Sequence, residues 1–227
     1  MQSIKKEQMK KFTDTKLGKS LSYFGVLIGL IGLTHGIPEI LQGEILVKTN
    51  RFNAFPDNWP NEQLFELLQG QPAVTILTDI PFYVLGILAV LVSLVLIIYS
   101  AFFLNAKHSI LVFSILNTGI LLFGAGGGNP TLIGFPTIMA VLIFKYFGKK
   151  KKRTDANDAL NLQLFRLFLS IHLFSWVLLF PGIFIVDGLG IKPDALFFFS
   201  VMIMPLSILG TLIFGYRYDN TLRAGEA

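Results

Sequence analysis

His35 and Glu39 lie four residues apart within the apolar run of residues 21–46, and they are the residue types best suited to chemistry there. On a helix, side chains at this spacing share a face and can form a direct hydrogen bond. A carboxyl group beside an imidazole can exchange protons at neutral pH. Because burying an ionisable group at mid-bilayer costs roughly 2.5–3.5 kcal/mol, such a group is by default a functional hypothesis. Glu39 falls near the end of the run, so an interfacial role is the alternative.

Small residues predict how this run packs. Glycines and Glu39 recur at alternating steps of four and three, which places them on one narrow helix face: Gly25, Gly29, Gly32, Gly36, Glu39 and Gly43. As a helix the run is about 39 Å long, enough to cross a hydrocarbon core of about 30 Å. We expect a neighbouring helix to pack on this face, with Glu39 pointing into the bundle rather than into lipid.

The composition is that of a membrane protein, because 53% of the residues are hydrophobic and only 15% are charged. We predict an all-α polytopic bundle of six transmembrane helices, forming one membrane domain over residues 20–218. The predicted spans are residues 21–46, 80–104, 109–124, 131–147, 162–186 and 195–216. Residues 1–19 and 219–227 are predicted tails, and residues 47–78 are a predicted external amphipathic segment.

The positive charge of the chain is unevenly distributed over this bundle. Of the 19 lysines and arginines, all but Lys48, Arg51 and Lys192 fall on one side. The positive-inside rule then predicts that both termini are cytoplasmic. No organelle address is evident, which favours a prokaryotic cell (plasma) membrane. The run KKKKR at residues 149–153 is interpreted as a topology signal rather than a nucleic-acid site.

Polar groups from several segments reach the outer third of the predicted bundle. These candidate binding residues are His35, Glu39, Asp79, Asn129 and Asp187. A cavity there, covered by a lid helix at residues 60–69, would suit a lipid or small amphiphile with a positive or hydroxylated group. In the alternative interpretation, 60–69 is only a membrane-hugging connector, Asp79 caps the following helix and Asp187 is a polar helix terminus.

Asn117 and His172 are assigned to helix packing, together with Gly25, Gly29, Gly32 and Gly36. The two polar side chains fall about 12 Å and about 15 Å from the cytoplasmic starts of their spans, so they could pair across the bundle. No metal site is predicted, because the His35–Glu39 pair has no second compact pair of ligands. The sequence has no cysteine and lacks flavin, haem and nucleotide signatures, so no cofactor is expected.

The sequence leaves three classes of function open. The first is non-enzymatic binding or transport of a lipid or amphiphile, and the second is an accessory subunit whose glycine face binds a partner's span. The third is an intramembrane acid–base enzyme, of isomerase or hydrolase type, in which Glu39 and Asp79 act on a lipid. The segments HGIPE at 35–39 and WVLLFPGIFIVD at 176–187 resemble the emopamil-binding, sterol-isomerase-like family. That resemblance implies buried acid and base groups acting on a lipid double bond.

Overall fold

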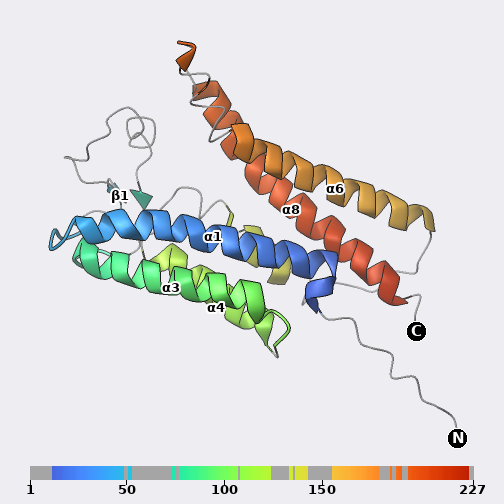
Figure 1. The fold of residues 1–227 in the computed structure, drawn as a ribbon, viewed down its shortest axis with the longest axis horizontal. Coiled ribbons are helices and arrows are strands. Elements are labelled where there is room, and N and C mark those ends of the chain that lie inside the picture. The colour runs from blue at the N-terminus through green and yellow to red at the C-terminus, as the bar shows by residue number, and fades with distance from the viewer. Residues whose placement is uncertain are drawn as a thin grey trace, which may run out of the picture.

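The chain folds into long helices in the computed structural model (Figure 1). The helices are η1 (Phe12–Asp14), α1 (Lys16–Leu41), α3 (Phe82–Phe102), α4 (Ser109–Leu122), α6 (Asp155–Val177) and α8 (Asp194–Ala224). Two short strands, β1 (Arg51–Phe52) and β2 (Ala73–Val74), pair antiparallel in the predicted external segment. The structure describes residues 12–48, 51–52, 73–74, 77–106, 108–123, 133–134, 136–142, 155–178, 185, 188–190 and 194–224.

Three helices of the described ranges are long and apolar enough to cross a membrane: Lys16–Leu41, Phe82–Phe102 and Asn157–Val177. The shorter helix Ser109–Leu122 is also apolar. The prediction of an all-α chain with helices able to span a membrane is therefore confirmed for these three helices, and the number of six spans stays a prediction. Of the predicted fourth span, residues 133–134 and 136–142 are helical. The predicted lid helix at 60–69 lies outside the described residues.

The ends of the first helix differ from the predicted span of residues 21–46. The helix begins earlier because Thr15 is its N-cap, with the Thr15 hydroxyl accepting a hydrogen bond from the Gly18 N–H at 3.0 Å. It ends at Leu41, and Gly43 follows with a φ of +68°, a left-handed conformation that glycine adopts readily. Helix α6 likewise begins at Asp155 rather than 162, and α8 runs from Asp194 to Ala224.

Helices α1 and α3 lie side by side along the glycine face of α1 (Figure 1). A Cβ on Gly36 would lie 3.0 Å from the Gly86 carbonyl oxygen, and a Cβ on Gly86 would lie 2.6 Å from the Gly36 carbonyl oxygen. Larger side chains would separate the two backbones at this point. The predicted neighbour of the glycine face is thus helix α3 of the same chain, packed at backbone distance.

The first turn of α3 is capped by backbone, not by a side chain. The Phe82 N–H donates to the Ile45 carbonyl at 3.0 Å, and the Tyr83 N–H donates to the Gly43 carbonyl at 3.0 Å. No side-chain cap is formed at the N-cap residue, Pro81. Asp79 is exposed in a left-handed conformation with a φ of 62°, so its interpretation as the helix cap is wrong.

Helices α6 and α8 form a second pair, which meets α1 near the N-terminal half of α1 (Figure 1). Phe168 of α6 lies against Gly210 of α8 and stacks on Phe214 with 5.5 Å between the ring centroids. One buried apolar cluster joins both helix pairs and α4, and it includes Leu21, Phe24 and Ile28 of α1, Phe113 and Ile120 of α4, and Met204, Ile208 and Leu212 of α8. The core of the described residues therefore lies where α1 meets α3, α4 and the α6–α8 pair.

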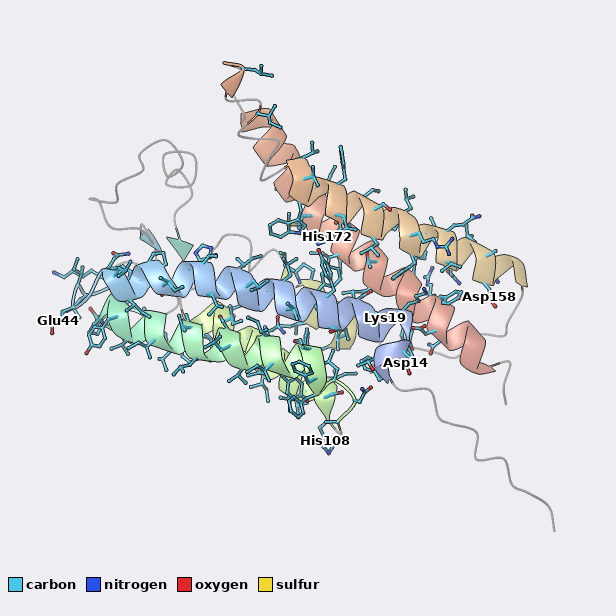
Figure 2. All side chains as sticks on the ribbon, viewed as in Figure 1. Asp14, Lys19, Glu44, His108, Asp158 and His172 are labelled. Carbon is cyan, nitrogen blue, oxygen red and sulfur yellow. The ribbon has the colours of Figure 1, made fainter. Side chains whose placement is uncertain are left out.

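Helix α1 begins at a junction of three segments. Asp219 of α8 accepts hydrogen bonds from the backbone N–H groups of Lys16, at 2.9 Å, and Leu17, at 2.8 Å. Asn105, after α3, accepts from the Thr13 N–H and donates to the Thr13 hydroxyl, each at 3.0 Å. The backbone N–H groups at the start of a helix have no partner within the helix. Here the N–H groups of Lys16, Leu17 and Thr13 bond to side chains of distant segments instead. Figure 2 shows Asp14, Lys19, His108 and Asp158 toward this end and Glu44 at the opposite end.

We expect Asp219→Asn to lower the free energy of unfolding by about 1 kcal/mol, because the charge near the positive N-terminus of α1 is lost and an amide cannot accept both hydrogen bonds. Denaturant titration of the purified protein in mixed micelles measures this difference. Asp14→Asn is the matched control, since Asp14 is exposed near the same helix end. Equal stability of the two variants would contradict a capping role for Asp219.

Candidate functional site

Glu39 is buried in the last turn of α1, where its side chain has no exposed surface. Neither carboxyl oxygen has a hydrogen-bond partner within the part of the chain that the structure describes. On a helix, positions 21, 28 and 39 fall on nearly one line, and Leu21 and Ile28 are core residues. Glu39 therefore lies on the same face of α1 as these two core residues, and not on the face toward lipid.

His35 stands one turn before Glu39 and is half-buried. Its Nδ1 atom is buried and, among the described residues, has no hydrogen-bond partner. No hydrogen bond joins it to Glu39, so the direct pair suggested by the i, i+4 spacing is not formed. Two neighbouring polar side chains thus present unpaired nitrogen and oxygen atoms inside the bundle, each needing a partner to offset its burial.

Close helix packing holds Glu39 in this position. Just before it, Gly36 meets Gly86 of α3, and just after it a Cβ on Gly86 would lie 2.7 Å from the Ile40 nitrogen. Pro38 lies inside the helix and has no N–H, so the carbonyl of Thr34 loses its usual helical donor. Contact with α3 therefore helps to hold the last turn of α1, where one helical hydrogen bond is missing.

The other predicted members of the outer site do not join this pair. Asp79 is exposed and forms no ion pair or hydrogen bond with Glu39 in the structure. Asn129 and Asp187 lie outside the described residues. The part of the candidate site that the structure describes is accordingly Glu39 with His35, both from α1.

His172 belongs to a separate packing cluster, toward the other end of α1. The Trp176 indole N–H donates to His172 Nε2 at 3.1 Å, and Ser207 Oγ lies 3.4 Å from His172 Nδ1. Because the Ser207 hydroxyl donates to the Met204 carbonyl, Nδ1 is the protonated nitrogen that donates to Ser207. The imidazole edge also meets Phe24, with ring centroids 5.1 Å apart. This histidine joins α6 to α1 and α8.

The suggested pair of Asn117 with His172 is not formed. The Asn117 amide nitrogen donates to the Phe113 carbonyl at 2.8 Å within α4, and both His172 ring nitrogens have other partners. Asn117 Oδ1 is buried, and the hydrogen bonds of the described residues leave it without a donor. It lies beside Gly134, where a Cβ would stand 3.7 Å from it. Depth from the helix start is one coordinate and does not determine which faces of two helices meet.

The α1–α3 interface between Glu39 and the start of α1 also contains two serines of α3 that residue spacing did not predict. Cβ atoms on Gly25 and Gly32 would overlap the hydroxyls of Ser100 and Ser93. Both hydroxyls lack nitrogen or oxygen partners among the described residues. Each lies close to a glycine of α1, and a glycine Cα–H group can donate a weak hydrogen bond to such an oxygen. The available signal was the spacing of small residues on α3, namely Gly86, Ala89, Ser93 and Ser100.

The described residues contain no group of three or more histidine, aspartate or glutamate side chains able to hold a metal ion. Glu39 and His35 offer unpaired hydrogen-bonding atoms, and an ionised Glu39 also offers a negative charge. Comparison with known protein families, curated proteins and solved structures found no match.

Proposed function

We propose that this chain is a membrane-embedded binding protein that receives the polar group of a lipid or small amphiphile at Glu39 and His35. The observation that carries the proposal is the complete burial of Glu39 with both carboxyl oxygens unpaired among the described residues. An unpaired buried polar group costs about 1–3 kcal/mol and a buried charge costs more. A ligand that donates hydrogen bonds to Glu39 would remove this free-energy cost. The burial of an unpaired Glu39 therefore favours ligand binding.

Binding is favoured over passage along the α1–α3 interface. On the side of Glu39 toward Lys16, Gly32 meets Ser93 and Gly29 meets Ile97. A Cβ on Gly29 would lie 2.9 Å from the Ser93 carbonyl oxygen, so there is no space for a ligand between these backbones. A group bound at Glu39 would leave this interface by the route through which it entered.

The same proposal includes six spans with both termini cytoplasmic. Lys16 and Lys19 at the start of α1, and Arg217 near the end of α8, support a common side for the two ends of the chain. Glu44 at the opposite end of α1 would then face outward, and the Glu39 site would open toward the outer leaflet. A reporter fused after Ala227 would report a cytoplasmic location, and an external location would contradict this topology.

Native mass spectrometry of gently purified protein tests the binding proposal. We expect a small amphiphile to be retained by the parent protein and lost from Glu39→Gln, because the amide replaces one acceptor oxygen by a donor and removes the charge. Asp79→Asn is the matched control, since Asp79 is exposed near the same end of the bundle. Retention by all three proteins, or by none, would overturn the proposal.

The two competing functions have less support in the described residues. An acid–base enzyme would need a counterpart to Glu39, and Asp79, the predicted counterpart, is exposed. An accessory role through the glycine face would need that face to be free, and α3 packs along it. No observation among the described residues favours either function over binding.

A further inference from the structure

We propose that the group bound at Glu39 is an ammonium that carries N–H donors, such as the head of a primary amine. This inference rests on the proposed binding function and names the ligand class for the same site. The atoms that carry it are Glu39 Oε1, Glu39 Oε2 and His35 Nδ1, all buried and without partners among the described residues.

The first argument is the donor and acceptor character of these atoms. An ionised carboxylate offers only acceptors, and a neutral imidazole with its proton on Nε2 offers an acceptor at Nδ1. An ammonium group with three N–H bonds has three donors and one positive charge, which matches three acceptors and one negative charge. An anion would meet repulsion from an ionised Glu39.

The second argument separates this ligand from other cations. A tightly held metal ion needs more ligands than this pair supplies, and the described residues contain no suitable cluster. A quaternary ammonium has no N–H donors and is held by aromatic faces. A Cβ on Gly36, in this turn of α1, would meet Gly86, Ala89 and Val90 of α3, none of which is aromatic. A hydroxyl group donates one hydrogen bond and leaves the carboxylate charge unbalanced.

The test compares three single-chain amphiphiles of equal length: dodecylamine, dodecyltrimethylammonium and dodecanol. Binding to the full chain in a nonionic detergent is titrated at pH 7 by native mass spectrometry. We expect dodecylamine to bind at least ten-fold more tightly than either of the others, and we expect Glu39→Gln to abolish this preference. Glu44→Gln should retain it, because Glu44 is an exposed carboxylate beyond the same helix end.

The outcomes distinguish the two proposals. Equal Glu39-dependent binding of dodecylamine and dodecyltrimethylammonium, or tighter Glu39-dependent binding of dodecanol, would overturn the ammonium assignment while leaving the binding function in place. An amine preference that persists in Glu39→Gln would also overturn it. If no amphiphile binds in a Glu39-dependent way, the binding function fails together with the assignment. Matching elution profiles and far-UV circular dichroism of the parent and Glu39→Gln establish that both are folded.

Discussion

Gly86→Ala is expected to lower the free energy of unfolding by about 3 kcal/mol, although alanine is a better helix former than glycine. The added Cβ would lie 2.6 Å from the Gly36 carbonyl oxygen and 2.7 Å from the Ile40 nitrogen. Both are backbone atoms of α1, so relief requires the two helices to separate. Separation would weaken the packing that positions Glu39, and denaturant titration in mixed micelles measures the loss.

The matched control for this prediction is Gly119→Ala, in the last turn of α4. There the nearest atom to an added Cβ is a methyl carbon of Val92 at 3.1 Å, and this side chain can shift. We expect Gly119→Ala to change stability by less than about 1 kcal/mol, since higher helix propensity offsets the closer contact. If both variants lose equal stability, backbone contact between α1 and α3 is not the cause.

Glu39→Met is expected to raise the free energy of unfolding by about 2 kcal/mol while abolishing ligand retention. Methionine nearly preserves the side-chain length and removes two buried oxygens that lack partners in the described structure. Gain of stability with loss of binding is the signature of a residue retained for function rather than for folding. Thermal unfolding and native mass spectrometry of the same preparation measure the two effects.

Glu44→Met is the control for the stability gain, because its carboxylate is exposed and already solvated. We expect this variant to be no more stable than the parent. A large loss of stability in Glu39→Met would show that Glu39 has a partner that stabilises the fold, and the binding proposal would then lose its basis.

Residue spacing predicted one side of the central interface and missed the other. The glycines of α1 stand out because they repeat every three or four residues in an otherwise bulky segment. On α3 the matching face is built from Gly86, Ala89, Ser93 and Ser100, four positions of three residue types, so it reads as part of an ordinary apolar helix. Recognising it requires grouping residues by size rather than by identity.

The position of Asp79 could not be predicted from its neighbours. An Asp two residues before a proline, at the start of an apolar run, is a usual helix-start pattern. Here the residues after α1 supply carbonyl groups to the first N–H groups of α3, which leaves Asp79 outside the helix. These hydrogen bonds require residues 43–47 to lie against residues 79–83. The two segments are distant in the sequence, so the residues around Asp79 do not predict this contact.

The hydrogen bonds between Asp219 and the start of α1 can form only late in the synthesis of the chain. The amides of Lys16 and Leu17 bond to a carboxylate 203 and 202 positions later in the sequence. During translation these amides therefore meet their partner only after almost every helix has left the ribosome. A nascent or truncated chain that stops before residue 219 lacks the acceptors for these two amides, so the junction between α1 and α8 forms only after Asp219 has been synthesised.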